Sequence, residues 1–292
     1  DDKLQTLSQT TVRLAQNSAW GSGSPLQPGE LPKLDDAKLF SHNGTLYVTY
    51  RNGKRFGHHI QLLNPLHVRM NGSVSFDVSV RASETVKVCC GRNIGFVSTA
   101  MESPTDAPPL LAIVWLSPLL VLEVDVGKAK TTPWPHAATT LRQPTRMGRM
   151  LHGTTGGLMY VPHTSEYLGL AHIHRSSDAH KLRRSSAMAR HGHHYTHFFY
   201  TLHARNLSMA RASDEFCFES ARRRGKCEII QYAGGLERLE NTQGPELLVS
   251  YGINDCEASV VTLGLQSVLG SLHVVKGSLE AMLHPLVQRS RG

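Results

Sequence analysis

Long apolar segments are missing from this 292-residue chain. The longest apolar run, Leu110–Leu122, has thirteen residues and is interrupted by Ser117 and Pro118. A helix that crosses a bilayer needs ~20 apolar residues, so we predict no membrane span. The run has the length and composition of two core strands joined by a turn.

Recognisable nucleic-acid modules are also missing, because the sequence has no zinc-finger spacing, no basic helix and no aromatic strand of the RNA-binding type. The formal net charge is +8, which would suit an anionic partner. The basic residues are scattered except at Lys181–Arg184 and Arg222–Arg224, two polar stretches that we interpret as solvated loops. We therefore expect no nucleic-acid partner. Sugar phosphates and nucleotide sugars are the anions that we consider first.

Spacings typical of metal sites are absent, since neither His-Glu-x-x-His nor Cys-x-x-Cys occurs. We expect no metal ion and no cofactor. A histidine-based metal centre is kept as an alternative, because imidazole binds zinc and other transition metals. That alternative depends on the run His191–Tyr200, which holds four of the seventeen histidines.

Cysteine is sparse, with five residues in the chain. Cys217 and Cys227 flank an Arg-rich connection between two predicted strands. A disulfide across the end of a hairpin and two unpaired buried thiols both fit this spacing. Cys89 and Cys90 are adjacent in a predicted strand, so their side chains point to opposite faces and are not expected to bridge each other.

An initiator Met and a signal peptide are absent from the start of the sequence, which we interpret as a fragment or a processed product. Three glycosylation sequons begin at Asn43, Asn71 and Asn206. They tilt the prediction toward the lumen of the secretory pathway or a secreted protein, but the sequence does not fix the compartment.

Amphipathic helix patterns are almost absent before residues 278–288, and short β-prone runs separated by turns fill the chain instead. The clearest pair is a predicted hairpin in which Asp35–Phe40 and Leu46–Tyr50 flank an Asn43–Gly44 turn. The alternation in the second strand predicts burial of one face only. Later strands are predicted at 110–116, 119–125, 158–161, 167–173, 194–203, 214–218, 227–232, 246–252 and 257–264.

Sequential short strands in units of about 45–60 residues favour a β-propeller. We predict an all-β fold, a five-bladed β-propeller. A propeller with an incomplete first blade is a variant of this prediction. A β-sandwich is the alternative fold, although roughly 230 residues of short strands exceed the roughly 100 usual for a sandwich. The expected domains are an N-terminal extension or partial blade at 1–34, the propeller at 35–265, and a C-terminal tail at 266–292 with room for a short helix.

Several strand motifs follow one another in a specific order: Asp36–Phe40 with Leu46–Tyr50, Gly91–Phe96, Ser117–Asp125, Tyr167–His172 and Leu248–Asp255. This order resembles the five-bladed propellers of the mannoside phosphorylases, glycoside hydrolase family 130, and related propeller glycosyltransferases. The resemblance covers about residues 35–265. It implies a carbohydrate-active enzyme that transfers or cleaves a hexosyl unit such as mannose, of the glycosyltransferase or the glycoside phosphorylase or hydrolase type.

Three features depart from the pattern of that family. Ala37–Lys38 replaces Pro-Arg, Arg92–Ile94 replaces Lys-Asn-Trp, and no first blade with the proton-donating Asp is found. These departures motivate an alternative function, a non-catalytic propeller that binds carbohydrate or another partner.

The predicted catalytic residues are two carboxylates, because inverting glycosyl transfer or hydrolysis needs an acid to protonate a leaving oxygen or a base to deprotonate the acceptor. The resemblance matches Asp36 to the acidic opening of a blade and Asp255 to the acid of a late strand. Asp255 could equally cap its own tight turn.

The predicted substrate-binding residues are cationic or aromatic. Strand alternation places two of the histidines on one face, and a tyrosine and a histidine on one face of the next strand. The resemblance implies that His172 helps to hold phosphate. Each type of residue also has a competing interpretation. The histidines could form structural hydrogen bonds, the arginine could point outward to solvent, and the tyrosines could pack in the core. The residues are Arg51, His172, His174, Tyr195, His197 and Tyr251.

Overall fold

The computed structural model describes residues 13–14, 35–51, 60–71, 75–89, 91, 93–98, 109–135, 151–153, 157–176, 193–220, 228, 230–242, 244–254, 256–277 and 279–283. Within these residues strands predominate, and the helices are short. No helix in the described part of the chain combines the length and the apolar character needed to cross a bilayer.

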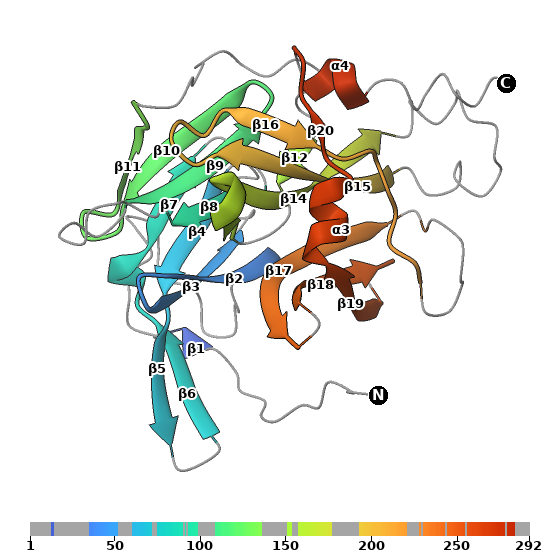
Figure 1. Ribbon diagram of the computed structural model, residues 1–292. Helices are drawn as coiled ribbons and strands as arrows, with labels where there is room; N and C mark the ends of the chain where they lie inside the picture. The colour runs from blue at the N-terminus through green and yellow to red at the C-terminus, as the bar shows by residue number, and fades with distance from the viewer. Residues whose placement is uncertain are drawn as a thin grey trace, which may run out of the picture.

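Four mainly antiparallel sheets are arranged as the blades of a β-propeller (Figure 1). Blade one consists of β2 (Asp35–His42), β3 (Thr45–Arg51), β4 (Ile60–Pro65) and β7 (Val86–Cys89). Blade two consists of β8 (Gly95–Ser98), β9 (Leu110–Leu116), β10 (Leu119–Asp125) and β11 (Lys130–Pro133). In both blades the strands lie side by side in the order in which they occur in the chain.

The strands of blade four are inserted in the chain between two strands of blade three. Blade three consists of β12 (Leu151–Gly153), β13 (Met159–Val161), β14 (Glu166–Ser176), β15 (His193–His203), β16 (Met209–Ala212) and β20 (His273–Val274). Blade four consists of β17 (Gln231–Asn241), β18 (Gly244–Ile253) and β19 (Glu257–Gly264). The chain thus leaves blade three, builds blade four, and returns through β20 to pair with β16.

The remaining elements lie outside the blades. Strands β5 (His67–Asn71) and β6 (Ser75–Val80) form a hairpin that projects from blade one, and β1 (Arg13–Leu14) pairs with β6 (Figure 1). The helical elements are η1 (Ala82–Glu84), η3 (Pro162–Thr164), α3 (Leu265–Gly270) and α4 (Leu279–Leu283).

The predicted first hairpin is confirmed. His42 pairs with Thr45 across a two-residue turn in which Asn43 and Gly44 have φ values of 48° and 71°. Asn-Gly favours this turn because both positions need positive φ. The prediction that β3 is buried on one face only is wrong, because Tyr47 and Tyr50, on opposite faces of the strand, are both buried.

Burial of β3 on both faces follows from its place in a blade that packs against neighbours. On one face Tyr47 stacks on Phe40, and Phe40 in turn stacks on Phe96 of blade two with ring centroids 4.7 Å apart. On the other face Tyr50 is 1% exposed and donates a hydrogen bond of 2.9 Å to Asn64 Oδ1. Blade two therefore covers one face of β3, while β4 and the β5–β6 hairpin cover the other.

The β-propeller prediction is confirmed, and the arrangement in blades rules out the sandwich. Strands β9 and β10 confirm the two core strands predicted in the apolar run. Residues 214–218 do not form a regular strand, because only Phe216 bridges to His197, and β17 extends to Asn241, well past its predicted end at residue 232. The described residues form four blades; a fifth blade and the domain limits stay predictions.

Candidate functional site

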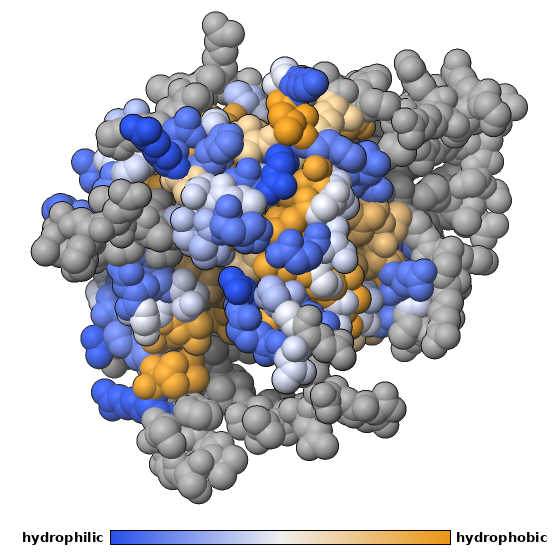
Figure 2. Space-filling model, viewed as in Figure 1, coloured by the Kyte–Doolittle hydropathy of each residue, from blue (hydrophilic) through white to orange (hydrophobic). Residues whose placement is uncertain are grey.

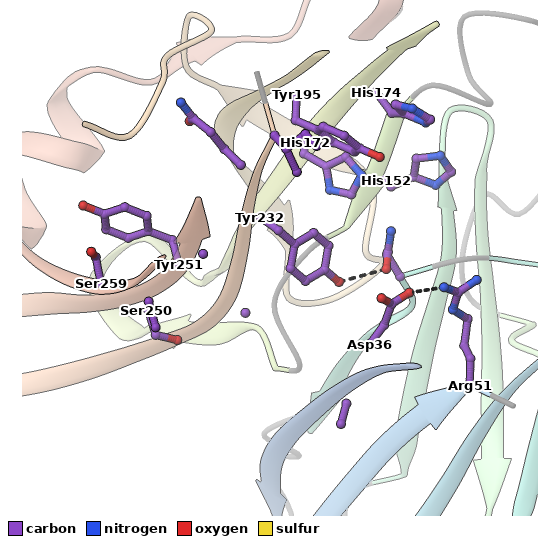
Figure 3. A pocket seen from close by; sticks show the side chains of 17 residues that line it. Asp36, Arg51, His152, His172, His174, Tyr195, Tyr232, Ser250, Tyr251 and Ser259 are labelled. Atoms are coloured by element: carbon purple, nitrogen blue, oxygen red, sulfur yellow. Dashed lines mark hydrogen bonds and ion pairs between the residues drawn. The ribbon is translucent and has the colours of Figure 1, made fainter. Parts of the chain in front are cut away.

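A cavity of about 640 Å³ lies where the four blades meet (Figure 3). Every blade contributes through residues in, or just before, its first strand. The lining residues at these positions are Asp36 and Ala37 of β2, Asn93 before β8, His152 of β12, and Gln231, Tyr232 and Gly234 of β17. We call this space the axial cavity.

One wall of the axial cavity is a ladder of rings on blade three. His172 and His174 are two residues apart in β14, so their side chains point to the same face, and both line the cavity. His174 pairs in register with Tyr195 of β15. The rings of His174 and Tyr195 stack in parallel with centroids 4.6 Å apart. His152 of β12 pairs with His172 on the other side, with ring centroids 5.3 Å apart.

The opposite wall carries an ion pair between Asp36 and Arg51. A bulge between Asp35 and Lys38 interrupts the pairing of β2 with β3, and Asp36 has φ 54° within it. Bulges of this kind re-aim a side chain, and here the Asp36 carboxylate reaches Arg51 at the cavity (Figure 3). Arg51 is 6% exposed, and its Nε and Nη1 have no hydrogen-bond partner among the described residues.

Lys38 does not line the cavity but is buried next to Tyr232, a residue that does. Its side chain is 3% exposed, its Nζ has no hydrogen-bond partner among the described residues, and Nζ lies 5.3 Å from the centroid of the Tyr232 ring. Burial lowers the pKa of Lys38 to about 7, although the Asp36 charge acts in the opposite direction. Tyr232 donates a hydrogen bond of 2.8 Å to Asn93 Oδ1, which joins blade four to blade two above the lysine.

Two buried histidines, His172 on the cavity wall and His197 behind it, are neutral near pH 7. Burial, and then the neighbouring His152 and His197, lower the pKa of His172 well below its ordinary value. Burial lowers the pKa of His197 to about 3. A neutral His172 retains one ring N–H to donate and one ring nitrogen to accept.

The structure brings together six of the eight residues predicted for the site: Asp36, Arg51, His172, His174, Tyr195 and Tyr251 all line the axial cavity. His197 does not line it; the ring is fully buried between His172 and Phe218, with centroid distances of 6.3 and 4.8 Å. Asp255 lies outside the described residues, so its role stays a prediction.

Sequence reasoning missed Lys38, Asn93, His152 and Tyr232. A signal existed for Lys38, which occupies the position of the arginine in the blade opening of the resembling family and shares a strand face with Phe40. His152 and Tyr232 carried no comparable signal, because their place at the cavity depends on which blades become neighbours.

The other predicted chemistry has a mixed outcome. Cys217 is disulfide-bonded, which excludes an unpaired thiol at that position, and Cys89 is also disulfide-bonded. Cys227 and Cys90 lie outside the described residues, so the Cys217–Cys227 pairing stays a prediction. Within the described residues no three His, Cys, Asp or Glu side chains are placed to share a metal ion.

Comparisons with known proteins identify no family for this chain. No protein-family model matches the sequence, and no curated protein matches it. One similar solved structure is an exo-1,5-alpha-L-arabinanase from a bovine ruminal metagenomic library, at 8% identity and a TM-score of 0.37, with 88% of this chain and 83% of that chain covered.

A second similar structure is a subtype N10 neuraminidase-like protein of A/little yellow-shouldered bat/Guatemala/060/2010, at 8% identity and a TM-score of 0.35. The match covers 79% of this chain but spans only 59% of the neuraminidase-like chain. Likenesses of this size carry no information on activity or substrate.

Proposed function

We propose that this chain is a carbohydrate-active propeller enzyme that transfers or cleaves a hexosyl, mannose-like unit in the axial cavity. The observation that carries the proposal is the convergence of residues from all four blades, including six named from the sequence, on one cavity of about 640 Å³. Small-ligand sites typically have volumes of about 300–1,000 Å³ and a few convergent polar groups.

The aromatic residues of the cavity suit a sugar ring. Tyr195, Tyr232 and Tyr251 all line it, and each combines an apolar ring with a hydroxyl. The ring packs against the C–H face of a sugar, while the hydroxyl exchanges hydrogen bonds with sugar hydroxyls.

The buried cations support an anionic group on the donor or the acceptor, such as phosphate or the diphosphate of a nucleotide sugar. Lys38 and Arg51 are nearly inaccessible, and their Nζ, Nε and Nη1 atoms have no hydrogen-bond partners among the described residues. Leaving buried donors without partners is costly, so a group that accepts hydrogen bonds from them would bind favourably. Neutral His172 adds a further donor at the cavity.

Asp36 has the role of base in this proposal. It is the only carboxylate among the described residues that line the axial cavity, and Arg51 holds it in place. In a transfer reaction Asp36 takes the proton of the attacking hydroxyl as that oxygen bonds to the anomeric carbon. The bond from the anomeric carbon to the leaving oxygen breaks, and the leaving group carries away the electron pair.

The test compares Asp36→Asn with Asp125→Asn, a change at an exposed carboxylate that pairs with Lys128 on the surface. Product formation is measured with mannosides plus phosphate and with nucleotide sugars plus mannose. Removing a general base typically costs about 10²–10⁴-fold in rate, so Asp36→Asn is expected to lose at least ~100-fold while Asp125→Asn keeps wild-type activity. Full activity in a correctly folded Asp36→Asn variant would remove Asp36 from catalysis.

A non-catalytic carbohydrate-binding propeller is the second candidate. It is favoured by the presence of a single carboxylate among the described lining residues, where two are usual for glycosyl chemistry. Thermal-shift measurements with mannosides, sugar phosphates and nucleotide sugars separate the candidates when combined with the activity assay. Stabilisation by a ligand without any product supports the binding protein, whereas product formation excludes it.

A further inference from the structure

A second cavity, of about 600 Å³, lies between blades three and four, next to the end of α3. It lies on the side of the molecule that carries α3, where Figure 2 shows apolar side chains between polar ones. Four aromatic residues line it: Phe199 of β15, Phe216 and Phe218 of the segment that follows β16, and Tyr251 of β18. We call this space the interblade cavity.

The interblade cavity and the axial cavity border the same part of blade four. Tyr251 lines both cavities and pairs in register with Ser259 of β19. Ser259, Val261 and Leu263 alternate along β19 and therefore point to the same face. Ser259 lines the axial cavity, while Val261 and Leu263 line the interblade cavity, so a ligand that follows this face passes from one to the other.

The aromatic residues form a connected surface along this path. The rings of Phe218 and Tyr251 stack with centroids 4.4 Å apart, and those of Phe199 and Phe216 stack at 5.2 Å. The Tyr251 hydroxyl donates a hydrogen bond of 2.9 Å to the Glu219 carbonyl, which fixes the ring at the junction. Fixed aromatic surfaces are suited to the apolar faces of sugar rings.

The charged residues of the two cavities differ. In the axial cavity Arg51 pairs with the single carboxylate, Asp36, and the buried Lys38 lies against the ring of Tyr232, a lining residue. Among the described residues, three carboxylates and no Lys or Arg line the interblade cavity: Asp214, Glu215 and Glu219. Carboxylates accept hydrogen bonds from sugar hydroxyls and repel negative charge. A ligand that fills both cavities is therefore expected to have its anionic group in the axial cavity. The part of the ligand in the interblade cavity is expected to be uncharged.

We propose that the interblade cavity is a subsite for further uncharged hexosyl units of an oligosaccharide whose reacting end occupies the axial cavity. This inference rests on the proposed function, because it names the substrate as an oligosaccharide longer than a disaccharide. It also assigns selectivity: sugars with carboxylate groups are disfavoured beyond the reacting end.

Two adjacent residues provide a matched test. Val261 lines the interblade cavity, whereas Val260 is 42% exposed and points to the opposite face of the same strand. Val261→Trp would fill the cavity, and Val260→Trp adds the same side chain outside it. Affinities for mannose and for a five-unit manno-oligosaccharide are measured by titration calorimetry with both variants and the wild type, after thermal unfolding has verified folding.

The wild type is expected to bind the oligosaccharide more tightly than mannose. Val261→Trp should weaken oligosaccharide binding about tenfold, equivalent to ~1.4 kcal/mol, and leave mannose binding unchanged. Val260→Trp should alter neither. If Val261→Trp binds the oligosaccharide as the wild type does, the subsite is overturned while the proposed function stands. If the wild type binds no saccharide or sugar phosphate at all, both are overturned.

A second variant covers the case in which Val261→Trp does not fold. Glu219 is exposed, so Glu219→Gln removes a charge from the interblade cavity with little effect on packing. An oligosaccharide with uronic-acid units should bind this variant about threefold more tightly than it binds the wild type, since one like-charge repulsion is lost. Unchanged affinity for the acidic oligosaccharide would contradict the selectivity assigned to this cavity.

Discussion

Lys38 is the residue at which burial and charge conflict most strongly. Its ammonium group lies under the Tyr232 ring with Asp36 and Arg51 as charged neighbours, and burial lowers its pKa from 10.5 to about 7. A fully buried lysine without a compensating partner destabilises the folded state when it is protonated. Its burial next to Asp36 and Tyr232, which line the axial cavity, motivates the proposed role in holding an anion.

The first prediction concerns the pH dependence of stability. Between pH 7 and pH 10.5 the unfolded chain holds a proton on Lys38 that the folded chain does not, so the Lys38 contribution makes the free energy of unfolding rise with pH, by up to about 1.4 kcal/mol per unit. Lys38→Met should remove this contribution and stabilise the protein at pH 7 and below.

Urea unfolding at a series of pH values measures the effect. Lys87→Met, at an exposed position of β7, is the control and should retain the wild-type slope. Identical slopes for Lys38→Met and the wild type would contradict the assignment. Phosphate should stabilise the wild type less as the pH rises above 7, because neutral Lys38 no longer attracts an anion.

At the level of single residues, sequence reasoning succeeded where strand periodicity alone decides the outcome. His172 and His174, two residues apart, reach the same cavity because successive side chains in a strand alternate. His197 shares a face with Tyr195 but is covered by Phe216 and Phe218, which come from a segment without regular strand structure. The burial of His197 by these two rings depends on tertiary packing, which the alternation of side chains along a strand does not predict.

At the level of elements, the pair β14 and β15 is the longest ladder that positions the site, with continuous pairing from Glu166↔His203 to Ser176↔His193. Gly169 lies opposite Tyr200 in this ladder, and a Cβ atom at Gly169 would come within 2.5 Å of Cζ of the Tyr200 ring. Tyr200 is 1% exposed, so its ring has no free space into which it can move.

The second prediction is that Gly169→Ala destabilises the fold by about 1–3 kcal/mol through overpacking. The control is Gly234→Ala in β17, where the nearest atom to the added methyl group is Ser250 Oγ at 3.9 Å. Midpoints of urea unfolding measure both changes. A Gly169→Ala variant as stable as Gly234→Ala would show that the β14–β15 pair adjusts to the extra atom.

Element boundaries were less predictable than the presence of elements. The Asn43–Gly44 turn and the pair of strands in the run Leu110–Leu122 carry strong local signals and were predicted correctly. The extension of β17 to Asn241 has no such signal, because its outer half, from Glu237 onward, is exposed and polar except for Leu239. Pairing with β18 imposes a strand there that local preference does not indicate.

At the level of the whole molecule, the number and spacing of short strands predicted a propeller. They did not predict which segments outside the blades pack against the blades. Helix α4 lies far from β15 in sequence, yet Leu279 and Leu283 belong to the same buried cluster as Phe198 and Tyr200 of β15. The segment after α3 is therefore part of the propeller core in the folded protein.

The third prediction follows from this packing. Leu283 is 2% exposed, and Leu283→Ala should lower the free energy of unfolding by about 2–5 kcal/mol. Val274→Ala, at a position 64% exposed in β20, should change it by less than about 0.5 kcal/mol. Equal unfolding midpoints for the two variants would mean that α4 is dispensable for the core.

The return of the chain to blade three has a consequence for the order of assembly. The outer edge of β16 is completed by β20, which follows all three strands of blade four in the chain. During synthesis from the N-terminus, β16 therefore presents an open strand edge until β20, which follows α3, has been made. An open edge of this kind invites pairing with other chains. Closure of blade three is thus a late event, because β20 is made after every strand of blade four.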